Sequence, residues 1–281
     1  MSNILRLSAN TKTYRAMSND DIMRRAPSVF AQNASEKTSD RFLFIPTIQA
    51  VDAIRAQGFS VVQAMQTNSR TIDGKMSAKH MLRFRRNDQI GTLDVGGLAS
   101  EIVLFNAHDG TSVYHLSLGI FRQACANGLI VCDSLLASEK VKHIGYDDGK
   151  IIDATYRVID QAPKALESVK AMQSVELTRD EQLAFADAAK GLRWEQGDNA
   201  PDASKLLTVR RYDDQKNDLW TTFNRVQENI IKGGLRTISR DERGLVRRNS
   251  TREVASVTEN KRLNQALWEL AESMRKLKGA A

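Results

Sequence analysis

Residues 101–132 read EIVLFNAHDGTSVYHLSLGIFRQACANGLIVC and carry the strongest indication of the fold. Two β-prone apolar runs, at 102–107 and 112–118, are joined through Asp109-Gly110, a pair favoured at tight turns between antiparallel strands. Both faces of the first run are apolar, so we expect strands that are covered on both sides. The same stretch predicts that the second strand ends at Gly119, followed by a short helix over 120–126 and a strand over 129–131.

Around this hairpin the sequence predicts an α+β protein. Its antiparallel sheet is expected to contain residues 59–66, 78–86, 101–107 and 112–118. Helices over 151–192 are expected to pack on the sheet, with a division at Pro163 and a capping box at Thr178 and Glu181. With 281 residues, 41% of them hydrophobic, the chain is long enough for one large core or two modest ones.

A polar segment at 196–205, QGDNAPDASK, is the predicted linker between two regions. It separates an α+β core domain, 1–195, from a basic helical C-terminal region, 206–281. Within the second region the Arg-rich part at about 233–257 contains turn residues but no sustained hydrophobic pattern. That part is expected to be mobile.

The positive charge of the chain is concentrated near its C-terminus. Residues 205–281 hold 17 Lys and Arg against 10 Asp and Glu, whereas residues 1–204 hold 24 of each sign. A localised basic segment is the electrostatic feature expected of a protein that binds a phosphate backbone. A solvated loop whose charge only aids solubility is the alternative. The candidate phosphate-binding residues of this segment are Arg236, Arg240, Arg243, Arg247 and Arg248.

A second group of cations lies on the strand predicted over 78–86. Strict alternation places Lys79, Arg83 and Arg85 on one face of this strand. Three cations on one face repel each other unless solvent or an anion meets that face. Two interpretations stay open, a solvated outer face of the sheet and a surface that faces nucleic acid.

The histidines are the remaining candidates for catalysis. His108 and Asp109 lie at the hairpin turn, and His115 is expected on the following strand. With a nearby carboxylate they could form a metal site or a general-base cluster. A His-Asp pair in a tight turn more often has a structural role, because Asp suits the turn and His caps an apolar strand. We therefore assign no catalytic residue, and the chain is expected not to be an enzyme.

Other sequence features narrow the class of protein. The sequence has no phosphate-binding loop, dinucleotide fingerprint, nucleophile elbow or zinc-ligand pair, so we expect neither a cofactor nor a metal. No apolar run reaches the length of about 18 residues that a membrane span needs. Cys125 and Cys132 are expected to be free thiols in a reducing cytoplasm, since the N-terminal residues contain no apolar stretch of the signal-peptide type.

Several long stretches resemble a known family. These are PSVF at 27–30, FIPT at 44–47, KHMLRFRR at 79–86, LFNAHDGTSVYHL at 104–116, GIFRQACANGLIVC at 119–132, RRYDDQKNDLWTTFNRVQENIIKGGL at 210–235 and NQALWELAE at 264–272. The chain is similar to the phage- and plasmid-borne domain-of-unknown-function family of YfjQ/YafZ-like prophage proteins. The resemblance implies a role in the DNA metabolism or defence evasion of a mobile element, and it implies no catalytic residues.

From these features we expect a DNA-binding accessory protein of a phage, plasmid or integrative element. Single-strand binding or annealing is one form that this role could take, and the preference for single or double strands is left open. The first alternative is an anti-defence or regulatory protein that binds a host protein. A metal-dependent nuclease that uses His108, Asp109 and His115 is the second. Self-association is left open.

Overall fold

The computed structural model describes residues 15–279 except 37, 40, 41, 43, 92–97, 123–137, 142–147, 195–199 and 241–244. The described helices are α1 (Asn19–Arg25), α2 (Thr47–Ala56), α3 (Ile72–Ser77), α4 (Asp148–Ile159), α5 (Ala162–Ser174), α6 (Arg179–Gly191), α7 (Ala203–Leu206), α8 (Leu219–Lys232) and α9 (Val257–Leu277). Short 3-10 helices lie at Pro27–Phe30, Asn87–Gln89 and Tyr212–Asp214. The described strands are β1 (Phe59–Gln66), β2 (His80–Arg86), β3 (Leu98–Asn106), β4 (Tyr114–Arg122), β5 (Ser138–Val141), β6 (Arg236–Arg240) and β7 (Val246–Ser250).

The described residues form two compact units. The sheet unit contains residues 15–165 and 256–258, and the helical unit contains residues 166–255 and 259–279. The units therefore divide near Leu166 within α5, and not at the linker predicted over 196–205. Helix α7 occupies the end of that predicted linker, and residues 195–199 lie outside the described part of the chain.

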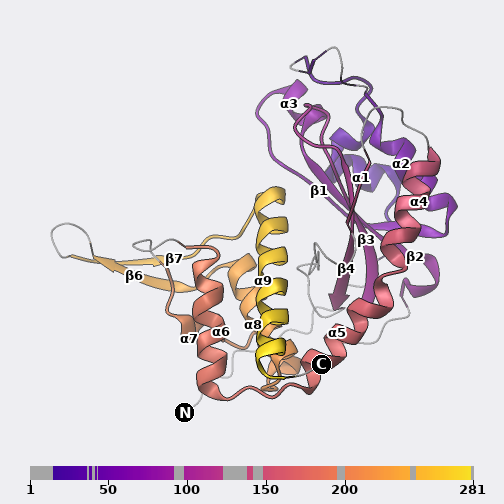
Figure 1. Ribbon diagram of the computed structural model, residues 1–281. Helices are drawn as coiled ribbons and strands as arrows, with labels where there is room; N and C mark the ends of the chain where they lie inside the picture. The colour runs from indigo at the N-terminus through magenta and orange to yellow at the C-terminus, as the bar shows by residue number, and fades with distance from the viewer. Residues whose placement is uncertain are drawn as a thin grey trace. The chain divides into compact units, whose positions relative to one another are not determined.

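The sheet unit contains a five-stranded antiparallel sheet in the order β1-β2-β3-β4-β5. Figure 1 labels the first four of these strands. Helix α4 contacts β3, β4 and β5 as well as α2, which contacts β1. Side chains such as Leu82, Phe84 and Leu104 are fully buried on this helix-covered face. The structure thus confirms the predicted α+β class, with a sheet packed by helices and a helical C-terminal region.

The central hairpin differs from its prediction in two details. Strand β3 ends at Asn106 and β4 begins at Tyr114, so the connection is longer than the one expected between the runs 102–107 and 112–118. Asp109 still organises it, because its Oδ1 accepts a hydrogen bond of 2.9 Å from the backbone N of Thr111. Strand β4 also continues through Gly119 to Arg122, where we expected a helix. The rest of that predicted helix, the strand over 129–131 and both cysteines lie outside the described residues.

Gly119 is required inside β4 by the packing of one face. It pairs with Glu101, and a Cβ built on it would lie 2.3 Å from the ring of Phe121. The missing side chain leaves room for that ring, over which the guanidinium of Arg83 lies 3.2 Å from the centroid. The glycine therefore serves close packing and does not end the strand.

The helical unit is built from α6, α7, α8 and α9. Thr178 and Glu181 form the predicted capping box at the start of α6, and the predicted division at Pro163 separates α4 from α5. Helix α6 contacts α7 and α8, so it belongs to this unit, although we expected it to pack on the sheet. In the described part of the chain no helix is both long enough and apolar enough to cross a membrane.

Candidate nucleic-acid interface

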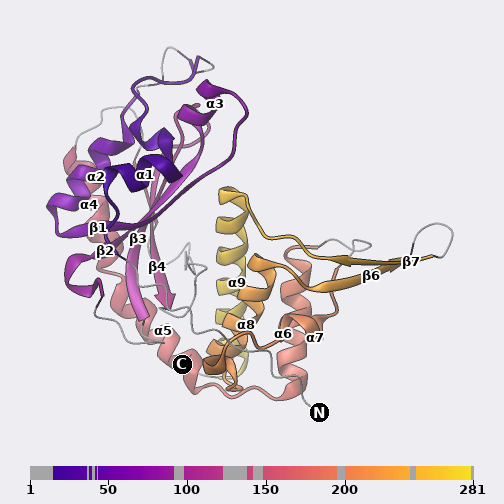
Figure 2. The same ribbon diagram turned by 180° about the vertical axis from the view of Figure 1, so that it is seen from behind.

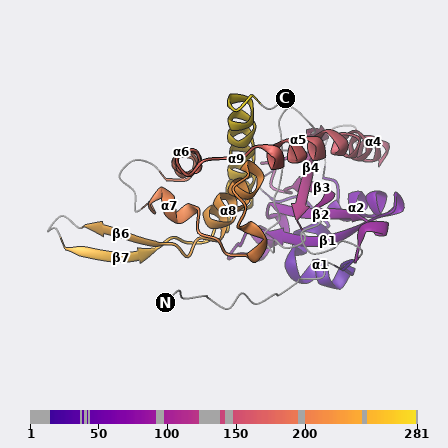
Figure 3. The same cartoon turned by 90° about the horizontal axis from the view of Figure 1, so that it is seen from below.

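The Arg-rich segment, in which the sequence shows no sustained hydrophobic pattern, contains a two-stranded antiparallel hairpin, β6–β7. We call these strands, Arg236–Arg240 and Val246–Ser250, the arm. Figures 1, 2 and 3 agree that the arm extends away from α6, α8 and α9 of its own unit. These three helices therefore leave the strands of the arm uncovered over most of their length.

A glycine pair lets the chain leave α8 and enter the arm. Gly233 ends α8 with φ 63° and ψ −145°, a backbone conformation that is essentially restricted to glycine. Directly after it, the backbone N of Gly234 donates to the Thr251 carbonyl at 2.7 Å, and the backbone N of Thr251 donates to the Leu235 carbonyl at 2.8 Å. These bonds join the two ends of the arm, and we call the bonded residues, Gly234, Leu235 and Thr251, together with Gly233, the root of the arm.

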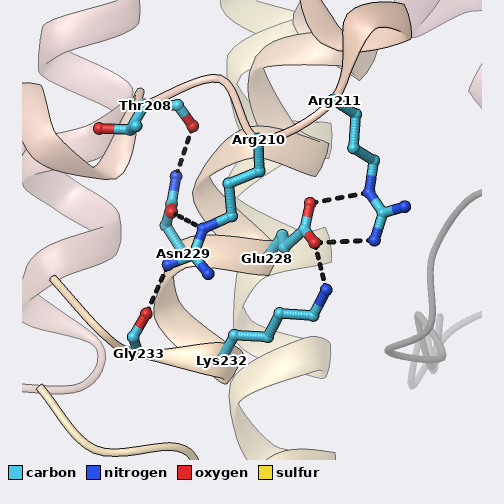
Figure 4. Close-up of polar contacts among 7 residues, drawn as sticks. All are labelled: Thr208, Arg210, Arg211, Glu228, Asn229, Lys232 and Gly233. Atoms are coloured by element: carbon cyan, nitrogen blue, oxygen red, sulfur yellow. Dashed lines mark hydrogen bonds and ion pairs between the residues drawn. The ribbon is translucent and has the colours of Figure 1, made fainter. Parts of the chain in front are cut away.

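Arg210 and Asn229 fasten this root to the helices (Figure 4). Asn229 lies on α8, and its Nδ2 donates to the carbonyls of Leu206 and Thr208, both at 2.9 Å. Its Oδ1 accepts from Arg210 Nε at 2.5 Å, while another guanidinium nitrogen of Arg210 donates to the carbonyl of Gly233. All donors and acceptors named here are paired, which defines the direction in which the chain leaves α8.

A buried carboxylate lies beside this contact. Glu228 on α8 is only 3% exposed, and Arg211 donates to both of its oxygens at 2.8 and 3.1 Å. Lys232 donates to the same carboxylate from one helical turn further on (Figure 4). Burial acts to raise the pKa of Glu228, but the hydrogen bonds from Arg211 and Lys232 outweigh it and hold the pKa below its usual 4.5. Arg211 and Lys232 are therefore paired within the protein, with Glu228.

The cations on the arm are used differently. Arg236 and Arg248 are exposed, and neither makes an ion pair with another described residue. The structure describes the strand positions of Arg240 and Arg247, whereas Arg243 lies outside the described residues. Exposed arginines that pair with no described residue are candidates for phosphate or base contacts.

Pairing of the strands assigns each arm residue to a face. One face contains Arg236, Ile238, Arg240, Val246, Arg248 and Ser250. Ile238 is 65% exposed and Val246 is 55% exposed on this face. Thr237 belongs to the opposite face and is buried. The outward face thus combines arginines with exposed apolar side chains.

The structure removes Arg83 and Arg85 from a phosphate-facing surface. Both side chains are fully buried, and both donate to Glu101, Arg83 Nε at 2.6 Å and Arg85 Nε at 2.8 Å. Arg83 also donates to Gln63. Our two interpretations considered only solvent or an external anion for this face, but Glu101 on the neighbouring strand supplies the anion from within the sheet.

Lys79 and Asp109 come together at the edge of one cavity. The cavity has a volume of about 400 Å³ and is lined mainly by serine and threonine residues. The ammonium of Lys79 donates to Thr258 Oγ1 at 3.3 Å. One half-exposed lysine remains from the predicted basic strand, so the arm carries the candidate interface.

The two candidate catalytic histidines lie on opposite faces of the sheet. His115 pairs with Phe105 and its ring stacks on that residue, with centroids 6.1 Å apart. His108 lies on the helix-covered side, where its Nε2 is 3.1 Å from Thr47 Oγ1. The described residues contain no group of three or more His, Cys, Asp or Glu that could hold a metal ion. The geometry therefore gives the nuclease alternative no shared site.

Thr47 joins buried polar groups that sequence reasoning missed. Its Oγ1 lies 2.9 Å from His80 Nε2 and accepts from Asn106 Nδ2 at 3.0 Å, in addition to its contact with His108. Burial lowers the pKa of His80 to about 4, so the ring is neutral at pH 7. A Thr that follows a Pro at a helix start looks like a cap, and the sequence offers no separate signal for this network.

Comparisons with known proteins agree with the resemblance found in the sequence. The profile of the family described as "Domain of unknown function (DUF932)" matches residues 35–268, which include the arm. The chain is 38% identical over 260 residues to the UPF0380 proteins YafZ and YfjQ of Escherichia coli strain K12, and each alignment covers 92% of both proteins. No solved structure matches the chain.

Proposed function

This chain belongs to the DUF932 family, and we propose that it is a DNA-binding protein whose arm supplies the phosphate contacts. The observation that carries the proposal is the contrast between two sets of cations. Arg210 is bonded to the carbonyl of Gly233, and Arg211 and Lys232 are bonded to Glu228 on α8. Arg236 and Arg248 on the arm itself are exposed and make no ion pair with a described residue.

Charge supports the same assignment. Residues 232–252 contain seven Lys and Arg against two Asp and Glu. Binding of such a segment to DNA releases counterions, so affinity should fall steeply as salt rises. The slope of log K against log salt is about −0.9 for each phosphate neutralised on duplex DNA.

Fluorescence anisotropy with labelled oligonucleotides, measured across a salt series, tests the proposal. The double variant Arg236→Ala/Arg248→Ala should reduce the magnitude of the slope by about 1.8, the value expected for two lost phosphate contacts. Arg25→Ala/Arg70→Ala is the matched control, because it removes two exposed arginines from the sheet unit. The control should leave the slope unchanged.

Two results would contradict the proposal. Equal slopes for the two double variants would mean that the arm arginines do not meet phosphate. Absence of binding to any oligonucleotide at low salt would favour the alternative of a protein partner, to which the exposed Ile238 and Val246 could contribute.

A further inference from the structure

Resting on the proposed function, we propose that the arm lies in the major groove of duplex DNA, with the face of Arg236, Ile238 and Arg248 against the base edges. The proposal starts from the pairing of Ile238 with Arg248, which places a branched apolar side chain directly opposite a guanidinium on one face. Arg236 precedes Ile238 by two residues and therefore shares that face.

The dimensions of the arm suit this groove. The major groove of B-DNA is about 12 Å wide and admits a two-stranded β-ribbon, whereas the minor groove is about 6 Å wide. A five-residue strand such as Arg236–Arg240 is about 17 Å long, which is enough to cross the major groove. The root bonds from Arg210 and Asn229 hold the start of the arm, so less conformational freedom is lost on binding.

The chemistry of the face also matches what the major groove presents. Arginine pairs with the O6 and N7 acceptors of guanine, and apolar side chains contact the C5-methyl group of thymine. Ile238 is 65% exposed, and contact with thymine methyl groups would remove this apolar surface from water. A phosphate-only role explains the arginines but leaves the exposed Ile238 and Val246 without a purpose.

Single-stranded DNA is a poorer match. Proteins that bind single strands without sequence preference stack the bases on aromatic side chains. The sequence of residues 236–250, which contains both strands of the arm, includes no aromatic residue. Duplex DNA is therefore the substrate class that the arm fits.

The test compares two duplexes of alternating A·T sequence, one with thymine and the other with uracil in its place. The wild-type chain should bind the thymine duplex more tightly by about fourfold for one methyl group that becomes buried. Ile238→Ala should abolish this preference, because it removes the apolar partner of the methyl group. Asn249→Ala, on the opposite face of the arm, is the control and should retain the preference.

Further measurements separate this inference from the proposed function. Equal binding of the two duplexes by the wild-type chain, displacement by the minor-groove ligand netropsin, or tighter binding of a single strand would overturn the major-groove placement while DNA binding itself stands. No binding of any of these DNAs at low salt would overturn both.

Discussion

A Cβ atom built on Gly233 would lie 2.5 Å from the carbonyl oxygen of Arg252. Gly233 lies where the chain leaves α8 for the arm, and Arg252 follows the second strand of the arm by two residues. Their close approach requires a residue without a side chain, because the opposing atoms belong to the backbone and cannot rotate away. The root of the arm thus depends on a glycine for contact as well as for conformation.

Gly233→Ala should lower the free energy of unfolding of the helical unit by about 2 kcal/mol or more, through backbone strain and the clash with Arg252. Urea unfolding followed by tryptophan fluorescence measures it, since Trp220 and Trp268 are buried in this unit. Gly234→Ala is the control. Gly234 also has positive φ, 76°, but has open space around it, so the loss should be about 1 kcal/mol. Equal losses would show that the close approach to Arg252 is unimportant.

Glu228→Gln should destabilise the helical unit by about 2 kcal/mol at pH 7, because Arg211 and Lys232 lose their shared countercharge. The pKa of Glu228 is lowered in the folded protein, so its contribution is full above the usual value of 4.5 and is lost as the pH falls through the folded-state pKa. The difference between wild type and variant should therefore shrink below pH 4.5. A difference that stays constant down to pH 3, measured by urea unfolding, would contradict a role of the charge.

Glu101→Gln should lower the free energy of unfolding of the sheet unit by about 3 kcal/mol or more, because two buried guanidinium groups would lose their carboxylate. Urea unfolding followed by circular dichroism provides the measurement. Glu139→Gln is the control, since Glu139 is partly exposed and pairs with Arg157 at 3.2 Å; its effect should stay below about 1 kcal/mol. If the two variants behaved alike, Arg83 and Arg85 would not depend on Glu101.

Local signals in the sequence predicted much of the fold. Strand β1 lies where it was expected, at Phe59–Gln66, and the alternation of residues 78–86 correctly separated the two faces of β2. The capping box at Thr178 and Glu181 located the start of α6. These features depend on neighbouring residues, and a short window of sequence contains them.

Features that depend on distant residues could not be read in this way. Alternation shows that Arg83 and Arg85 share a face, but only the register of β2 and β3 reveals that Glu101 meets them there. Likewise Gly119 looks like the end of a strand until the ring of Phe121 is seen to fill the adjoining space. Packing across the sheet decided both cases.

The sequence did not predict the hairpin form of the segment that we propose as the interface. Only charge pointed to residues 233–257. The sequence RTISR at 236–240 also contains a weak period of two, in which Thr237 and Ser239 lie on one face of the strand and Ile238 on the other. An exposed ribbon does not need a buried apolar face, so the hydrophobic pattern that indicates most strands is absent. Ile238 and Val246 were missed for this reason.

The most direct measurement of the central claim is the DNA affinity of a chain without the arm. Replacing residues 236–250 by Asn-Gly should close the root as a tight turn, because Leu235 and Thr251 are already hydrogen-bonded at 2.8 Å. Our account predicts that this variant retains the wild-type melting temperature within about 5 °C, a shift that corresponds to about 1 kcal/mol. It also predicts that duplex binding at 50 mM salt falls by a factor of about ten or more, as the loss of several phosphate contacts requires. A folded variant that binds DNA as tightly as the full chain would contradict the account.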